Sequence, residues 1–181
     1  MNPRFMMILS MAIFGTLGLF VRNIDVASGE LALYRAVMAA LFLTTVFLIT
    51  KRRIEWAKIR KEVPFLIASG VAVGINWILL FEAYKYTTIS LATLSYYFAP
   101  VLVTAICPFL FKEKLTPKQI ICFVMSTLGI VLITGIGGTN GQNNLVGIMF
   151  GLGAAVFYAS VILLNKFIKN VGGMDRTLLQ F

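Results

Sequence analysis

Six long apolar segments alternate with short polar stretches along the chain. Most of them approach or exceed the roughly 20 residues that an α-helix needs to cross the hydrocarbon core of a bilayer. The pattern therefore predicts an all-α polytopic membrane protein. The expected helices cover Met6–Val21, Leu31–Thr50, Val63–Ala83, Thr88–Phe111, Pro117–Thr134 and Leu145–Ile168.

The segment Thr88–Phe111 has 24 residues and no formal charge, and it contains Pro100 and Pro108. A proline inside a helix removes one backbone donor and clashes with the carbonyl group four residues earlier. We therefore expect Pro100 to bend this helix and to leave the Tyr96 carbonyl without its intrahelical partner. Because a bilayer tolerates freed backbone groups only where protein or a wet cavity satisfies them, we expect one of these beside the bend.

One face of this bent segment combines hydroxyl groups with aromatic rings, because its residues recur at helical spacing. A polar and aromatic face inside a membrane indicates a path for a substrate. Packing against neighbouring helices is the alternative for its two tyrosines. The face consists of Thr93, Tyr96, Tyr97, Pro100 and Thr104.

Arg35 is a charged candidate for the same path, since it lies about one turn inside its apolar segment. Three interpretations are open. The side chain could reach back to the membrane interface, contact an anionic group of a substrate, or pair with Glu30 or Asp25.

Asn76, Trp77 and Tyr158 are further candidates. The eight candidate substrate-binding residues are Arg35, Asn76, Trp77, Thr93, Tyr96, Tyr97, Pro100 and Tyr158. A polar asparagine in the middle of an apolar segment must find a partner, so it faces other helices or water. A structural hydrogen bond and a substrate contact explain Asn76 equally well. We expect a local ion pair between Glu82 and Lys85, which lie three residues apart.

Small residues recur every four positions on three segments, and such stripes allow helices to approach closely in a membrane. The stripes are Ala32, Ala36 and Ala40; Gly70 and Gly74; and Gly147, Gly151, Ala155 and Ala159.

Composition and charge agree with a membrane location. The chain is 59% hydrophobic and 13% charged, whereas a soluble domain averages roughly 45–50% apolar and about 25% charged residues. The net charge of +9 could suggest nucleic acid, but 13 of the 16 Lys and Arg residues fall on one side of the predicted membrane. The positive-inside rule explains this asymmetry, places the N-terminus in the cytoplasm and makes a nucleic-acid partner unnecessary.

The residues offer little for catalysis or cofactor binding. The sequence has no histidine, and Cys107 and Cys122 lie in apolar segments, where we expect them to be packing residues. Asp25 and Asp175 lie outside the apolar segments. We therefore expect no enzyme, no catalytic residue, no metal site and no cofactor.

The run AYKYTTISLATLSYYFAPVLVTAI, followed by Glu113 and LTPKQIICFVMSTLGIVLI, resembles the EamA-type domain of the drug/metabolite transporter superfamily. The resemblance extends from Phe14-Gly15 through Arg35 to the sixth segment. Lys112-Glu113 stands where Gly-Glu is usual in that family.

The resemblance implies two inverted repeats of five helices each, with the substrate site between them. Residues 1–137 would form the first repeat, residues 138–144 an outer loop, and residues 145–181 the start of the second. Thr177–Phe181 would open a seventh helix. With about six of ten helices, this chain is expected to insert in membranes without transporting by itself.

The implied function is alternating-access transport, mainly export, of small metabolites across a bacterial cytoplasmic membrane. Amino acids, amines and other amphipathic solutes are the expected substrates. The expected partners are the lipid bilayer and a second copy of the chain in a homodimer. The alternative is a small membrane protein that assists assembly without transporting.

Overall fold

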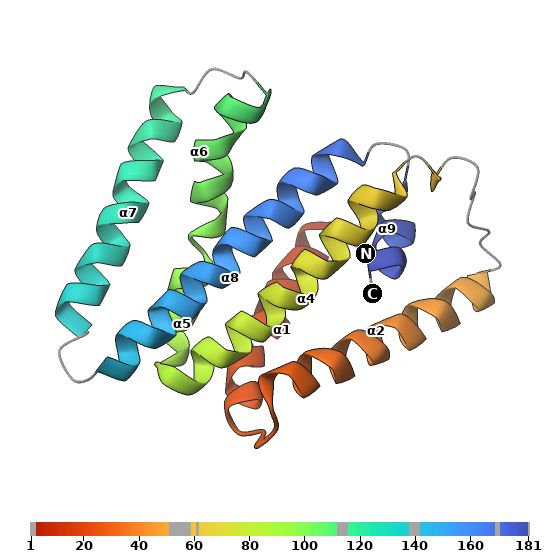
Figure 1. The fold of residues 1–181 in the computed structure, drawn as a ribbon, viewed down its shortest axis with the longest axis horizontal. Coiled ribbons are helices and arrows are strands. Elements are labelled where there is room, and N and C mark those ends of the chain that lie inside the picture. Colours follow the sequence, from red (N-terminus) through yellow and green to blue (C-terminus); the bar gives the residue numbers. More distant parts are fainter. Residues whose placement is uncertain are drawn as a thin grey trace.

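The computed structural model describes residues 3–50, 59–60, 62–111, 116–137, 142–168 and 171–180, and these form eight α-helices (Figure 1). The all-α prediction is confirmed. Most of the basic stretches 51–62 and 112–118 lie outside the described residues. The helices are α1 (Pro3–Arg22), α2 (Ser28–Thr50), α4 (Val63–Tyr86), α5 (Ile89–Tyr96), α6 (Ala99–Phe111), α7 (Pro117–Gly137), α8 (Gln142–Phe167) and α9 (Gly173–Gln180).

Four stretches of the described residues are long and apolar enough to cross a membrane: Ser28–Thr50, Val63–Tyr86, Ile89–Pro108 and Asn144–Phe167. This confirms a polytopic membrane protein. We also expect α1 and α7 to cross the membrane, which stays a prediction.

Two helices begin earlier in the sequence than the apolar residues suggest. The helix α8 begins at Gln142, inside the expected outer loop 138–144, and α9 begins at Gly173, before the expected start at Thr177. The first turn of a helix can lie outside the apolar layer and carry polar residues.

The apolar segment Thr88–Phe111 is divided into α5 and α6, so the predicted bend is confirmed. The helix α5 is capped by Thr88, whose Oγ1 accepts a hydrogen bond from the Leu91 N–H at 3.3 Å. At the division, the Phe98 N–H donates to the Ser95 carbonyl at 3.2 Å, a tighter turn than that of an α-helix. Pro100 follows in the first turn of α6, where a missing N–H is tolerated.

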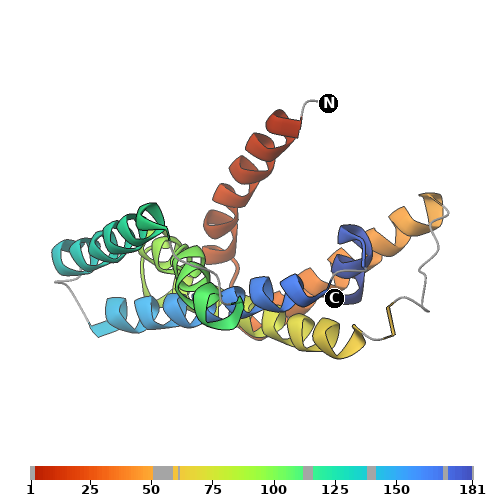
Figure 2. The same ribbon diagram turned by 90° about the horizontal axis from the view of Figure 1, so that it is seen from above.

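The helices α4 and α8 cross the middle of the molecule side by side (Figures 1 and 2). Their contact brings Phe81 and Ala154 into one buried cluster. The predicted small-residue stripe on α8 packs closely against the residue that follows α4 and against α5. A Cβ atom added at Gly147 would lie 2.5 Å from the Thr87 Cβ, and one at Gly151 would lie 2.8 Å from the Ser95 Cβ.

The short helix α9 packs against α2 and α4. A Cβ at Gly70 would lie 2.7 Å from the Gln180 carbonyl oxygen, whereas one at Gly74 would meet nothing within 4 Å. The Gln180 Nε2 donates to the Ser69 Oγ at 2.7 Å and to the Asn165 Oδ1 at 2.8 Å. The close crossing predicted at Gly70 is therefore made with α9.

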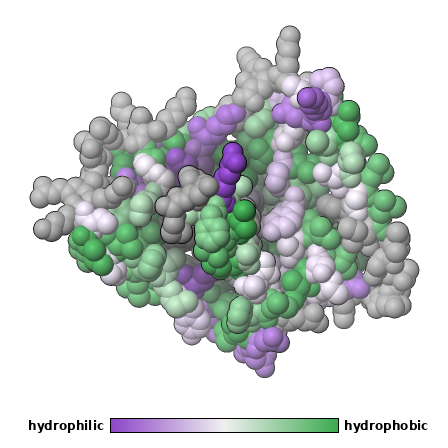
Figure 3. All heavy atoms as spheres, turned by 180° about the vertical axis from the view of Figure 1, so that it is seen from behind, coloured by the Kyte–Doolittle hydropathy of each residue, from purple (hydrophilic) through white to green (hydrophobic). Residues whose placement is uncertain are grey.

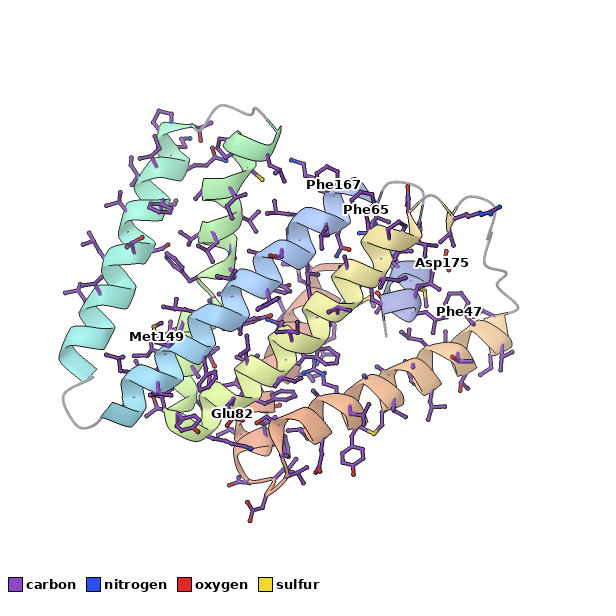
Figure 4. The ribbon with its side chains drawn as sticks, in the orientation of Figure 1. Phe47, Phe65, Glu82, Met149, Phe167 and Asp175 are labelled. Carbon is purple, nitrogen blue, oxygen red and sulfur yellow. The ribbon has the colours of Figure 1, made fainter. Side chains whose placement is uncertain are left out.

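Two contacts fix the opposite ends of α4 (Figure 4). Near its start, the rings of Phe65 and Phe167 stack with centroids 5.7 Å apart. Near its end, the Glu82 carboxylate accepts a hydrogen bond from Ser28 and lies 3.8 Å from the Lys85 Nζ. The predicted pair between Glu82 and Lys85 is confirmed, and Ser28 joins it from α2.

Apolar side chains cover much of the outside. The helix α1 projects away from the layer that contains α4 and α8 (Figure 2), and hydrophobic residues are spread over much of the face in Figure 3. Phe42 on α2 and Met125 on α7 are each 68% exposed. Such surfaces suit contact with lipid or with further membrane helices rather than with water.

Candidate functional site

A cavity of about 370 Å³ lies among five parts of the fold: α1, α2, α4, the α5–α6 bend and α8. Its volume falls within the range of small-molecule sites, about 300–1,000 Å³. The described residues that line it are Ser10, Gly15, Gly18, Arg35, Trp77, Leu80, Tyr84, Thr93, Tyr96, Tyr97, Pro100 and Tyr158.

The α5–α6 bend presents an aromatic wall to this cavity. Tyr96 ends α5, and Tyr97 follows in the non-helical turn before Pro100. The Tyr96 ring lies 6.0 Å from that of Tyr97 and 5.3 Å from that of Tyr158 on α8, measured between centroids. Both pairs are tilted, as aromatic rings in favourable contact usually are.

Arg35 contributes the cavity's positive charge. Its guanidinium carbon lies 4.3 Å from the centroid of the Trp77 ring, well inside the distance for a cation–π interaction. Both side chains are half-buried. Arg35 therefore lines the cavity from α2 while Trp77 supports it from α4.

Tyr84 and the glycines of α1 complete the opposite side. The Tyr84 hydroxyl and the Thr93 Oγ1 lie 3.4 Å apart, close enough to share a hydrogen bond. A Cβ at Gly18 would lie 2.6 Å from the Ile89 Cγ2 and 3.5 Å from the Tyr84 ring, so a glycine is needed for α1 to approach here. Gly15 faces open space, since nothing lies within 4 Å of an added Cβ.

The structure does not place Asn76 in the cavity lining. Asn76 is 1% exposed, and its Nδ2 donates to the Ala154 carbonyl of α8 at 2.7 Å. Its side chain is also close to that of Tyr96. Of the two interpretations left open by the sequence, this geometry favours the structural hydrogen bond.

Thr104 also lies elsewhere. Its side chain, predicted to share the polar face, lines a separate groove with Pro100 and α7, and its Oγ1 donates to the Pro100 carbonyl at 2.9 Å. Because α6 starts anew after the bend, residues on either side of it no longer share one helical face.

The cavity brings together seven of the eight candidate residues: Arg35, Trp77, Thr93, Tyr96, Tyr97, Pro100 and Tyr158. The sequence interpretation missed Tyr84, although it lies seven residues after Trp77 on the same helix and therefore on the same face. It also missed Ser10 and Leu80 and gave the α1 glycines no role in the cavity.

The side chains that line the cavity are mostly aromatic, hydroxyl-bearing or small. Among the described residues, no group of three or more His, Cys, Asp or Glu side chains could hold a metal ion. Arg35 is the one formally charged side chain among the described lining residues, and the others are aromatic, hydroxyl-bearing, apolar or glycine. The cavity can therefore hold a small solute by ring contacts, hydroxyl groups and one positive charge.

Residues 3–135 match the EamA-like transporter family. The chain belongs to this family. This EamA-family chain is 34% identical over 178 residues to an uncharacterized transporter, YxxF, of Bacillus subtilis, covering 96% of this chain and 57% of the relative. It is 28% identical over 122 residues to an uncharacterized transporter of Pseudomonas aeruginosa, covering 65% of this chain and 41% of the relative.

A human relative extends the comparison. Over 179 residues the EamA-family chain is 27% identical to solute carrier family 35 member G1 of Homo sapiens, covering 92% of this chain and 48% of the relative. The chain thus spans about half the length of the curated relatives it matches. No solved structure matches it.

Proposed function

We propose that this chain forms the substrate cavity of a bacterial cytoplasmic-membrane transporter that moves small amphipathic metabolites, mainly outward, by alternating access. The observation that carries the proposal is the cavity of about 370 Å³ with one arginine and an aromatic wall, formed by membrane helices. A charged side chain at membrane depth is costly and typically marks a path for a solute or an ion.

The division between α5 and α6 supports the same proposal. Discontinuous helices form substrate sites in many secondary transporters, because backbone that leaves the helix can line a cavity there. Tyr96, Tyr97 and Pro100 all line the cavity at this division.

The position of α8 supports the proposed two-repeat organisation. Residues 1–137 would form the first repeat, and α8 would open the second. Tyr158 of α8 faces Tyr96 of α5 at 5.3 Å, so both repeats would contribute to the cavity wall. A site between two repeats can open alternately to either side as one repeat rocks against the other.

Transport can be tested in proteoliposomes that contain the protein expressed from its complete reading frame. Vesicles would be loaded with labelled amino acids, amines and aromatic acids, and efflux would be followed over time. We expect efflux of at least one class, and we expect Tyr96→Ala and Tyr97→Ala to lower it severalfold, because each removes part of the aromatic wall.

The matched control is Tyr34→Ala, since Tyr34 is 58% exposed on α2 and does not line the cavity. Its efflux should equal that of the unaltered protein. Absence of efflux for every solute would contradict transport and favour a membrane protein with an assembly role. Equal loss in all three variants would contradict a role for the aromatic wall.

A further inference from the structure

The charge and shape of the cavity narrow the class of solute that it can hold. Resting on the proposed function, we infer that the cavity selects amphipathic anions: solutes with a carboxylate attached to an apolar, preferably aromatic, body. The proposal rests on the juxtaposition of Arg35, Trp77 and the tyrosine wall.

The first step concerns the guanidinium of Arg35. The guanidinium carbon lies over the Trp77 ring, 4.3 Å from its centroid, and the N–H groups of a guanidinium point outward along the edges of its plane. A carboxylate binds a guanidinium along one such edge through two parallel hydrogen bonds. Because a guanidinium has more than one edge, its contact with Trp77 is compatible with carboxylate binding.

The second step concerns the sign of the charge. Charges interact strongly where water is scarce, so the positive charge of Arg35 attracts an anion and repels a cation in this cavity. The nearest acid along α4, Glu82, does not line the cavity; it contacts Ser28 and Lys85. No Asp or Glu occurs among the described lining residues to reverse the sign.

The third step concerns the rings. Tyrosine and tryptophan faces can also bind an ammonium group, so an aromatic wall by itself would suit an amine. Here the Trp77 face is already covered by Arg35, and any ammonium at the neighbouring rings would lie close to a like charge. The rings of Tyr96, Tyr97 and Tyr158 are better suited to the apolar body of an anion.

Trp77 supplies a direct measure of binding. The sequence has two tryptophans, Trp56 and Trp77. The variant Trp56→Phe, with any tryptophan outside these 181 residues also replaced by phenylalanine, leaves Trp77 as the only one. A ligand that binds Arg35 changes the surroundings of the stacked indole and hence its fluorescence. The protein from the complete reading frame, in lipid nanodiscs, would be titrated with phenylacetate, phenethylamine and 2-phenylethanol, which share a phenyl group and differ in charge.

We expect phenylacetate to change Trp77 emission with a Kd at least tenfold lower than that of the amine or the alcohol. Arg35→Gln should abolish this preference, and Arg35→Lys should keep only part of it, because lysine retains the charge without the planar fork. Lys85→Gln is the matched control: Lys85 is a cation on α4 that does not line the cavity, so the preference should persist.

The outcomes separate this inference from the proposed function. Efflux of amines or neutral solutes, together with equal Kd values for all three probes in the Trp77 titrations, would overturn anion selectivity. The proposed transport function would still hold. Phenylacetate binding without efflux of any solute would support the inference and overturn transport. Trp77 emission that changes with none of the three probes would overturn the inference. The comparison of the three probes uses the protein with Arg35 intact, so it does not depend on whether the Arg35 variants fold.

Discussion

Asn76 illustrates how a polar side chain is accommodated inside an apolar helix bundle. The amide is almost completely buried, and its donor reaches the carbonyl of Ala154 on another helix at 2.7 Å. In a bilayer the alternative to this bond is an amide group among apolar chains, so the bond favours one register of α4 against α8. Asn76 therefore supports the cavity from behind its lining.

Asn76→Ala should lower the free energy of unfolding by about 1 kcal/mol, because interhelical hydrogen bonds in membranes contribute between about 0.6 and 2 kcal/mol. Thermal unfolding in detergent micelles would show a lower Tm. The matched control is Asn23→Ala. The Asn23 Nδ2 donates a similar bond to the Leu19 carbonyl at 3.0 Å, but this bond is exposed and joins residues only four positions apart. Equal Tm changes in both variants would contradict a special role for the buried bond.

The glycines of α8 give a second prediction for single residues. An added Cβ at Gly147 would lie 2.5 Å from Thr87, so Gly147→Ala should force α8 away from α4 and cost about 1–3 kcal/mol of stability. Gly129→Ala on α7 is the control, since nothing lies within 4 Å of the added carbon. It should be neutral or raise stability by up to about 1 kcal/mol. The reverse order of the two Tm values would show that α8 does not pack closely here.

At the scale of elements, the division between α5 and α6 determines which side chains enter the cavity. Pro100 lacks an N–H and lies in the first turn of α6, just after the bend. Tyr97 lies in the non-helical turn that follows α5, and it lines the cavity there beside Tyr96.

Pro100→Ala should allow α5 and α6 to join into a straighter helix, because the replacement restores the missing donor and removes the ring clash. We expect insertion in the membrane to be unchanged and efflux to fall severalfold as Tyr97 turns away. The distance between spin labels on α5 and α6 would report the straightening. Pro117→Ala, at the first residue of α7, is the control and should leave the efflux unchanged. An unchanged label distance in Pro100→Ala would contradict the proline as the cause of the bend.

The elements themselves could be predicted because each is long and apolar, and Pro100 indicated the bend. Seven cavity residues could be predicted because polar and aromatic side chains are unusual at membrane depth. Thr104 was placed wrongly because periodicity does not continue through a bend. The contact of Gln180 with Ser69 and Asn165 could not be anticipated, since it joins three helices whose neighbours are decided by packing rather than by local pattern.

For the whole molecule, the distribution of charge predicts the orientation in the membrane. Thirteen of the 16 Lys and Arg residues lie on one predicted side. By the positive-inside rule, the stretches 51–62 and 112–118 should face the cytoplasm and the stretch 135–144 should face outward.

Single cysteines at Lys58 and Asn140, in a background without Cys107 and Cys122, would test this orientation. Both labelling positions lie outside the described residues. An impermeant thiol reagent added to intact cells should label position 140 and spare position 58 until the membrane is opened. Equal labelling of both positions from outside would contradict the orientation.

The bond between Asn76 and Ala154 also has a consequence for biosynthesis, because its two partners are 78 residues apart. Ribosomes add about 5–20 residues per second, so Ala154 is made about 4–16 s after Asn76. During that interval the Asn76 amide has no acceptor on α8, because synthesis has not yet reached Ala154. Until then the Asn76 amide needs another hydrogen-bond partner, either in the insertion machinery or in water. A slower ribosome would lengthen the time in which quality-control proteases can recognise the unfinished bundle.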